Sequence, residues 1–236
     1  AGDDVASITD LILEDTYDFV TKVDDVDAVV HVELNNGVPV THVHPNLQGD
    51  IELKLPNGKY QLRVVAKGDR KETREFAIQG QNLTLETIVL AKASRILIPQ
   101  GEAMRLVFKG LDGTLDPDFQ NPLTGFTVRD DEGERKQRKV SSLFLAGIES
   151  DLDYVDVAPG RYQVYATRGI EYTVERSEIL LKQGETVELE IAVPRREIQT
   201  PGFIASDFHV HSGPSMDNAF STVERLRTFV AEHGEV

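Results

Sequence analysis

The sequence predicts a mainly β protein, with two tandem antiparallel β-sandwiches followed by one strand and one α-helix of an incomplete α/β domain. Short runs of alternating apolar and polar residues, separated by Asn, Gly and Pro, fill most of the chain up to Val193. Two of these stretches resemble each other, which indicates a duplicated unit. Beyond Val193 a basic connector leads to an apolar run and then to a helical pattern.

The first sandwich is expected over residues 27–92, after a leading strand segment at 1–26 that mixes apolar residues with acids. The Asn35-Asn36-Gly37 turn lies between two alternating runs. Asn-Gly is a strong hairpin signal because both central positions of the turn favour positive φ. Further runs on either side of Pro56-Asn57-Gly58 continue the pattern, so a small antiparallel sandwich is predicted.

The second sandwich, over residues 93–194, repeats the first. The sequence Lys-Tyr-Gln-Leu at 59–62 reappears as Arg-Tyr-Gln-Val at 161–164, each time after a Pro- and Gly-containing turn. Residues 76–90 likewise align with 179–193, and the turn glycines match within one residue. Similar hairpins at similar separations indicate a duplicated fold, and the spacing is too long for a solenoid.

The region at residues 110–139 interrupts the second strand pattern and is expected to form long surface loops. It contains Asp112, Asp116 and Asp118, which bring a calcium loop to mind. Their spacing does not fit an EF-hand, which needs acids at alternate positions, a central Gly and a closing Glu. An acidic turn held by Pro117 is the interpretation we adopt, with no ion assigned.

The last part, residues 195–236, is predicted to be a linker plus the first strand and helix of a further domain. In an extended strand alternate side chains share a face, so His209 and His211 can point at one ion while Phe208 and Val210 face a core.

Apolar residues recur every three to four positions over residues 218–233, which predicts a helix with one apolar stripe. Ser221 with Glu224 fits a capping box, and His233 with Gly234 fits a helix end. One helix and one strand cannot bury that stripe, so we expect it to pack on the second sandwich or on another copy of the chain.

Composition excludes some functions. The formal charge of −15 argues against nucleic acid as a partner, because proteins that bind nucleic acid concentrate Lys and Arg on the binding surface. No run approaches the roughly 18 apolar residues of a membrane span, and no signal segment is visible. The absence of cysteine leaves the compartment open. The missing initiator Met and the abrupt ends lead us to expect a piece of a longer protein.

A second histidine pair provides a comparison within the chain. His42 and His44 have the same spacing as His209 and His211, but no acid flanks them and Pro45 follows directly. Two histidines on the same face of a half-exposed strand are ordinarily solvated, so we expect His42 and His44 to be surface residues.

Two resemblances extend this interpretation. Residues 28–91 resemble carboxypeptidase-regulatory-like β-sandwich modules, which implies a spacer or binding module. The stretch SDFHVHSGPSMDN resembles the opening of PHP-type metallohydrolases, which carry D-x-H-x-H-S and then S-x-D. The residues that match are Asp207, His209, His211, Ser212, Ser215 and Asp217. Asn218 stands where glycine is frequent in that family, which affects only the shape of the loop.

The PHP resemblance implies the front part of a metal-dependent phosphoesterase, inactive alone because the later ligand motifs are missing. It implies that His209 and His211 ligate a divalent zinc, manganese or iron ion in the longer parent. Asp207 and Asp217 would orient ligands, and Ser212 and Ser215 would form turns or a phosphate loop. No tightly bound metal is expected within these residues, since two imidazoles leave the site half built. The implied partners are the rest of the PHP domain and a small phosphoester.

The alternative function is a non-catalytic β-sandwich module that binds a carbohydrate, a cell surface or a sister chain. On this hypothesis the histidine motif is incidental. A homo-oligomer formed through the C-terminal helix is a further possibility. The β-sandwich modules favour a secreted or periplasmic location, although no targeting signal is visible in the sequence.

Overall fold

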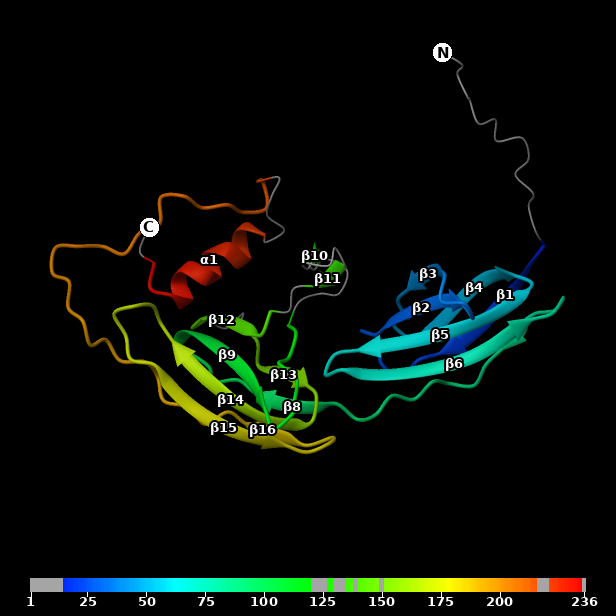
Figure 1. Ribbon diagram of the computed structural model, residues 1–236, viewed down its shortest axis with the longest axis horizontal. Coiled ribbons are helices and arrows are strands. Elements are labelled where there is room, and N and C mark those ends of the chain that lie inside the picture. The colour runs from blue at the N-terminus through cyan, green and yellow to red at the C-terminus, as the bar shows by residue number, and fades with distance from the viewer. Residues whose placement is uncertain are drawn as a thin grey trace, which may run out of the picture. The chain divides into compact units, whose positions relative to one another are not determined.

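The computed structural model describes residues 15–119, 127–129, 135–137, 140–148, 151–215 and 221–234 (Figure 1). At 127–129 and 135–137 only the backbone is described. The chain divides into two compact units, residues 1–91 and 92–236, and each is treated by itself. No helix in the described ranges is long and apolar enough to cross a membrane.

Unit 1 is a sandwich of a three-stranded and a four-stranded sheet over its described residues. The smaller sheet has the order β4-β1-β7, in which β1 pairs antiparallel with β4 and parallel with β7. The larger sheet has the order β3-β2-β5-β6 and is antiparallel throughout. The bounds of these strands are β1 Thr16–Lys22, β2 Val29–Leu34, β3 Pro39–Val43, β4 Asp50–Pro56, β5 Gly58–Ala66, β6 Arg70–Ile78 and β7 Leu83–Thr84.

Unit 2 has the same arrangement. Its smaller sheet has the order β13-β8-β16, again with one antiparallel and one parallel pair, and its larger sheet has the order β12-β9-β14-β15. A short antiparallel pair, β10 with β11, follows β9. The bounds are β8 Ser94–Leu97, β9 Ala103–Leu111, β10 Thr127–Arg129, β11 Arg135–Gln137, β12 Ser142–Ala146, β13 Tyr154–Val157, β14 Gly160–Thr167, β15 Glu175–Leu181 and β16 Thr186–Glu188, and the helix is α1 Thr222–Ala231.

The two units therefore share one topology. The strands β1 to β7 correspond in order to β8, β9, β12, β13, β14, β15 and β16, and the β10–β11 pair is an insertion in unit 2. The repeat seen in the sequence falls on the β5–β6 hairpin of unit 1 and the β14–β15 hairpin of unit 2. The mainly β class, with tandem sandwiches and one helix, is confirmed.

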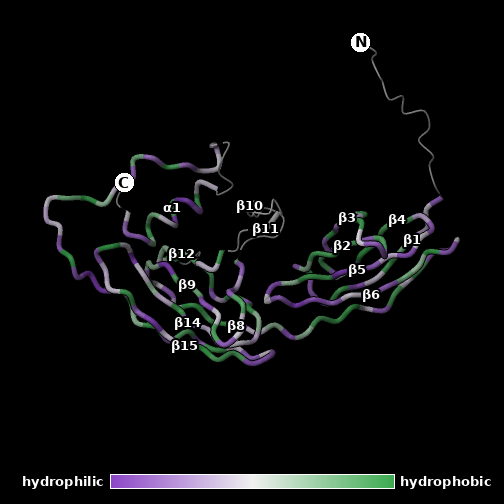
Figure 2. Tube along the Cα trace, in the orientation of Figure 1, coloured by the Kyte–Doolittle hydropathy of each residue, from purple (hydrophilic) through white to green (hydrophobic). Residues whose placement is uncertain are grey.

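Each unit has its own apolar core between its two sheets. Residues of β5 and β14 alternate between buried and less buried, and Figure 2 shows hydrophobic (green) and hydrophilic (purple) residues alternating along the strands. Tyr60 and Phe19 lie in the first core, with Phe76 stacked between their rings at 5.3 Å and 4.4 Å. Tyr162 and Phe108 lie in the second core. The larger sheet of each unit supplies most of these residues.

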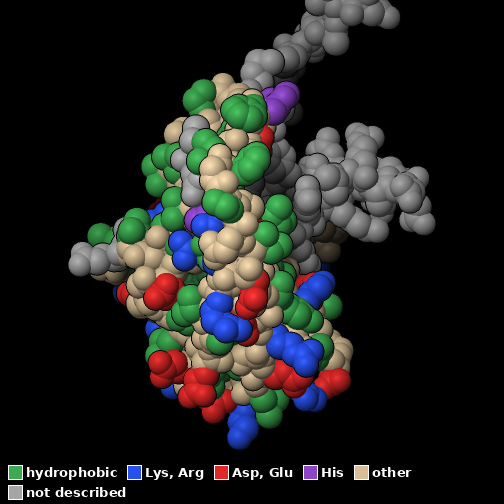
Figure 3. All heavy atoms as spheres, turned by 90° about the vertical axis from the view of Figure 1, so that its left-hand side faces the viewer, with side chains coloured by type: hydrophobic (Ala, Val, Ile, Leu, Met, Phe, Trp, Pro, Cys, Tyr) green, Lys and Arg blue, Asp and Glu red, His purple; other side chains and the backbone are tan. Residues whose placement is uncertain are grey.

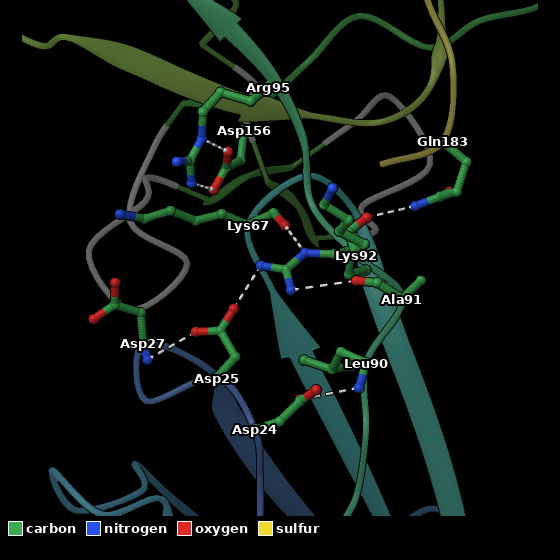
Figure 4. A network of polar contacts seen from close by, with 11 residues as sticks. Asp24, Asp25, Asp27, Lys67, Leu90, Ala91, Lys92, Arg95, Asp156 and Gln183 are labelled. Atoms are coloured by element: carbon green, nitrogen blue, oxygen red, sulfur yellow. Dashed lines mark hydrogen bonds and ion pairs between the residues drawn. The ribbon is translucent and has the colours of Figure 1, made fainter. Parts of the chain in front are cut away.

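Charged residues make close contacts within each sandwich (Figure 4). In unit 1 the guanidinium of Arg70 contacts Asp25 at 2.5 Å and also donates to the carbonyl of Lys67. In unit 2 Arg95 makes two bonds with Asp156, at 2.8 and 3.2 Å, and lies over the ring of Tyr154. The Arg70 contacts hold the loops that precede β2 and β6, whereas the Arg95–Asp156 pair joins the neighbouring strands β8 and β13.

Two expectations about the ends of the sandwiches need correction. The described part of the leading segment at 1–26 is not separate, because β1 lies at the centre of the smaller sheet of unit 1 and buries Phe19. The strand expected around residues 206–211 is not formed, since no described strand lies beside it to complete a ladder. Phe208, expected in a core, is 93% exposed.

The irregular region of unit 2 is closed by its acids. Asp116 accepts from the backbone N–H of Gly110 at 2.8 Å and contacts Lys109, while Asp118 accepts from the N–H of Val140 at 3.1 Å. Both carboxylates therefore hold the loop after β9 in place, Asp116 by bonds to β9 and Asp118 by a bond to the residues that precede β12. Much of residues 120–139 lies outside the described residues.

Candidate functional site

The segment that carries His209 and His211, residues 206–211, is called the histidine segment. It has no regular secondary structure and belongs to unit 2. The backbone N–H of His209 donates to the Asp207 carboxylate at 3.0 Å, which is an Asx turn. The rings of His209 and His211 stack with centroids 4.8 Å apart, and their Nε2 atoms are 2.7 Å apart. One of these nitrogens must donate and the other accept, so the two imidazoles carry different tautomers or one of them is protonated.

The sequence pairs His209 with His211, and the structure brings them together, but through a turn rather than a strand. No cluster of three or more His, Cys, Asp or Glu side chains able to hold a metal occurs among the described residues. Ser212 accepts from the N–H of Ser215 at 2.7 Å, so these serines form a turn. Asp217 lies outside the described residues, as does Asn218. The roles predicted for these residues remain predictions.

Helix α1 begins as the sequence predicts. The hydroxyl of Ser221 accepts from the N–H of Glu224 at 3.2 Å, and the Glu224 carboxylate accepts from the N–H of Ser221 at 3.1 Å. This reciprocal capping box fixes the first turn. At the other end His233, rather than Gly234, takes the left-handed conformation with φ 58°.

Polar contacts hold α1 on the outside of the β12-β9-β14-β15 sheet, against β12 and β9. Arg227 pairs at 3.2 Å with Asp151, whose side chain is 3% exposed, and Arg105 pairs at 3.1 Å with Glu232. Gly169 approaches so closely that a Cβ there would lie 2.4 Å from the Glu232 carbonyl oxygen. Ala231 is the fully buried residue of the helix.

Most of the apolar stripe of α1 faces outward as a result, whereas Phe229 is half-buried. Val223 is 63% exposed, Leu226 60% and Val230 42%, because the charged side of the helix occupies the sheet. The stripe is joined to the histidine segment, since Arg225 donates to the carbonyl of His211 at 2.9 Å. We call the exposed part of the stripe the α1 face, and its members are Val223, Leu226 and Val230.

Figure 3 shows the same contrast over the whole of this side of unit 2. Hydrophobic side chains gather over the upper part of the view, whereas Lys, Arg, Asp and Glu crowd its lower part. The connector that precedes the histidine segment adds further exposed apolar groups, Phe203 and Ile204. An exposed apolar area on this scale is typical of an interaction surface.

A network around Glu171 anchors the connector. The Glu171 carboxylate pairs with Arg196 and accepts from the Thr200 hydroxyl at 2.6 Å. The Thr200 hydroxyl bond is the largest cause that lowers the pKa of Glu171 below its ordinary value, and Arg196 lowers it further. Beside it, the Tyr172 hydroxyl contacts His233 Nδ1 at 3.3 Å, so the connector, the Tyr172 loop and the end of α1 meet here.

A second histidine group, in unit 1, was only partly visible in the sequence. His31 on β2 lies directly opposite His42 on β3, with ring centroids 6.2 Å apart. Burial lowers the pKa of His31, and Arg63, His42 and His44 lower it further while Glu33 raises it. Sequence reasoning paired His42 with His44 but missed His31, because only the register of β2 against β3 brings it close.

Comparison with known proteins gives no family. No family model matches the chain, and no curated protein matches it. Among solved structures, the TIE protein of Bacillus anthracis is 14% identical over 77% of this chain, with a TM-score of 0.33. A DUF3823 family protein from Parabacteroides merdae is 10% identical over 72% of this chain and 99% of its own, with a TM-score of 0.28. A DUF3823 family protein from Bacteroides ovatus is 13% identical over 71% and 96%, with a TM-score of 0.28. The chain spans about a third, 34%, of the TIE protein.

The resemblance to PHP-type hydrolases is wrong. No family model supports the PHP motif or the carboxypeptidase-regulatory-like modules, and the solved structures named above are DUF3823 family proteins and a TIE protein. The structure agrees in one respect, because the motif needs a strand and residues 206–211 form none. The assignment as part of a hydrolase or phosphoesterase falls with the resemblance. What stands is a pair of β-sandwich units with an attached helix.

Proposed function

We propose that this chain is a non-catalytic β-sandwich module that self-associates through the α1 face. One observation carries the proposal: the apolar stripe of a capped and anchored helix is turned away from its own sandwich. Val223, Leu226 and Val230 recur at spacings of three and four, which is the spacing of a helix–helix seam. A stripe of this kind in a protein that stayed alone would leave large apolar side chains in water.

The face is preformed, which favours association. The capping box, the Arg227–Asp151 pair and the Arg105–Glu232 pair hold α1 in place before any partner arrives. Little conformational entropy is then lost when the face is covered, apart from the side chains on it.

A second copy is the occupant that we infer, because α1 carries little of the net charge that makes two copies repel each other. The chain carries −15, so two copies repel each other over most of their surface. Helix α1 is an exception because its charged residues are Glu224, Arg225 and Arg227. A two-fold contact places the same apolar stripe on both sides of the interface, so each copy covers apolar side chains of the other.

The size of the contact is limited by the helix, since a helix of ten residues is about 15 Å long. The contact is therefore small, and a dissociation constant of roughly 10–100 μM is expected.

Sedimentation velocity over a concentration series tests the proposal. The wild-type chain should shift from monomer to dimer as concentration rises, and Leu226→Glu should stay monomeric. Leu180→Glu is the matched control, since Leu180 is 65% exposed on β15, away from α1, and should dimerise like the wild type. A wild type that stays monomeric at every concentration, or a dimer that Leu226→Glu leaves intact, would contradict the proposal.

We extend the proposal to a secreted or periplasmic location, because sandwich modules of this kind are common in cell-surface proteins. Fractionation of cells that express the native gene checks this part. Recovery of the protein with cytoplasmic markers would overturn it without affecting the proposed self-association.

A further inference from the structure

A hydrogen-bonded turn in the connector presents two large apolar side chains to solvent. The backbone N–H of Phe203 donates to the carbonyl oxygen of Thr200 at 3.1 Å, and Gly202 has φ +86°. Pro201 and Gly202 occupy the two central positions, which is the sequence that a type II turn favours. Phe203 is 80% exposed and the next residue, Ile204, is 63% exposed.

This turn, residues 200–204, is called the connector turn, and its base is held in place. The hydroxyl of Thr200 donates to the Glu171 carboxylate at 2.6 Å, and Arg196 donates to the same hydroxyl at 3.1 Å. The N–H of Glu197 donates to the carbonyl oxygen of Glu171 at 2.9 Å. The two apolar side chains are therefore displayed on a fixed base, so little ordering of the backbone is required when they are covered.

The chain around the turn is electrically neutral. No charged residue occurs at 198–206, whereas 28% of the whole chain is charged. The Glu171 carboxylate at the base is paired with Arg196. Phe203 and Ile204 can therefore leave water without an unpaired charge being buried with them, which would be costly.

A lipid bilayer is the occupant that this small neutral tip fits. A specific protein interface buries about 800 Å² on each partner. Phe203 and Ile204 together offer on the order of 300 Å², which is too little for such an interface. The hydrocarbon of a bilayer requires no complementary surface, because the hydrophobic effect depends on the apolar area removed from water and has no preferred direction.

We propose that the connector turn inserts Phe203 and Ile204 into the surface of a zwitterionic lipid membrane. Elements that lie at a membrane surface bury their apolar side chains about 5–10 Å into the boundary between headgroups and acyl chains. The net charge of −15 selects among lipids, since an anionic surface repels the chain whereas phosphatidylcholine carries no net charge. This inference does not depend on self-association, because the α1 face contributes no residue to the connector turn.

A tryptophan reporter tests the insertion, because the chain contains no Trp. Phe203→Trp is titrated with phosphatidylcholine vesicles, and we expect its fluorescence to shift to shorter wavelength and to saturate as lipid is added. Leu47→Trp is the matched control. Leu47 is 88% exposed on a turn of unit 1 that a hydrogen bond from Gly49 to Asn46 closes, and it stands alone between polar neighbours, so no shift is expected there.

Flotation of the chain with vesicles gives a second readout. The wild type should float with phosphatidylcholine vesicles, and Phe203→Ser/Ile204→Ser should bind at least about tenfold more weakly, the scale set by burial of one large apolar side chain. Both side chains are exposed, so these substitutions leave the core packing intact. Leu226→Glu should bind like the wild type. Phosphatidylglycerol added to the vesicles should weaken binding, and added salt should restore it.

The proposal is overturned if neither a shift nor flotation occurs up to about 10 mM lipid, a concentration roughly a hundredfold above the scale for a single myristoyl chain. An equal shift in Leu47→Trp, or tighter binding to anionic vesicles, would overturn it as well. A shift in Phe203→Trp that follows protein concentration without lipid would replace the membrane by a contact between copies of the chain.

Discussion

Tyr60 in unit 1 and Tyr162 in unit 2 make the same hydrogen bond. Each hydroxyl donates to the carbonyl oxygen of the residue four positions earlier, at 2.9 Å to Pro56 and at 2.7 Å to Ala158. Both side chains are almost fully buried, and both stand near the start of a strand of the larger sheet, β5 or β14, that follows a strand of the smaller sheet. The bond satisfies a polar group that each core would otherwise leave without a partner.

Removal of either hydroxyl should therefore destabilise its own unit. We expect Tyr60→Phe and Tyr162→Phe each to lower the free energy of unfolding by about 1 kcal/mol, the net value of one internal hydrogen bond. Urea unfolding measures this loss. Tyr165→Phe is the control, since Tyr165 is on β14 too but faces the other side of the sheet. A loss as large in the control would show that the bond itself is not responsible.

The close approach of Gly169 to α1 predicts a local effect. A Cβ there would lie 2.4 Å from the Glu232 carbonyl oxygen, so Gly169→Ala should push the end of α1 off the sheet. Trypsin cleavage after Arg227 should then become faster.

Gly101→Ala separates this clash from backbone strain. Gly101 has φ +81° and Gly169 has φ +85°, but nothing lies within 4 Å of a Cβ at Gly101. Equal cleavage rates in both variants would mean that strain alone, rather than the contact with Glu232, loosens the helix.

The Arg227–Asp151 ion pair, in which the Asp151 side chain is buried, should contribute measurably to the free energy of unfolding. Asp151 also accepts from the N–H groups of Gly147 and Ile148, so Arg227→Ala leaves its carboxylate partly satisfied. We expect a loss of about 2 kcal/mol, within the range for a hydrogen bond to a charged group. Denaturant unfolding measures it. The exposed Arg195–Glu197 pair is the comparison, and Arg195→Ala should cost less than about 0.5 kcal/mol.

The lowered pKa of Glu171 predicts how the connector responds to acid. In the unfolded chain Glu171 titrates near 4.5, and in the folded chain it titrates lower because Thr200 and Arg196 favour its charged form. The ionised carboxylate thus stabilises the fold above pH 4.5, and this contribution is lost as the pH falls through the folded pKa. Thermal unfolding from pH 7 to about pH 3 should show Glu171→Gln less stable than the wild type at neutral pH and converging with it in acid. A difference that stays constant with pH would rule out this role.

The sequence predicted correctly those turns and helix ends that depend on residues close together in the chain. The Asn-Gly turn forms with Gly37 at φ +83° between β2 and β3, and the capping box of α1 forms as expected. The repeat was visible because each hairpin carries its own turn chemistry and its buried tyrosine. These features depend on residues close together in the chain.

Features that depend on distant neighbours were missed. Alternation around His209 and His211 looked like a strand, but a strand also needs a partner, and none of the described strands lies beside residues 206–211. His31 joins the histidine group only through the register of two strands. The outward direction of the α1 stripe follows from charged contacts to Arg105 and Asp151, which are far from the helix in sequence.

The central claim is that copies of this chain meet through the α1 face, and hydrogen exchange at several protein concentrations tests it most directly. The account predicts that protection of the backbone amides of α1, Thr222–Ala231, rises with concentration while that of the β5–β6 hairpin stays constant. Protection of α1 that is independent of concentration, or that rises on the sandwich strands instead, would contradict the account.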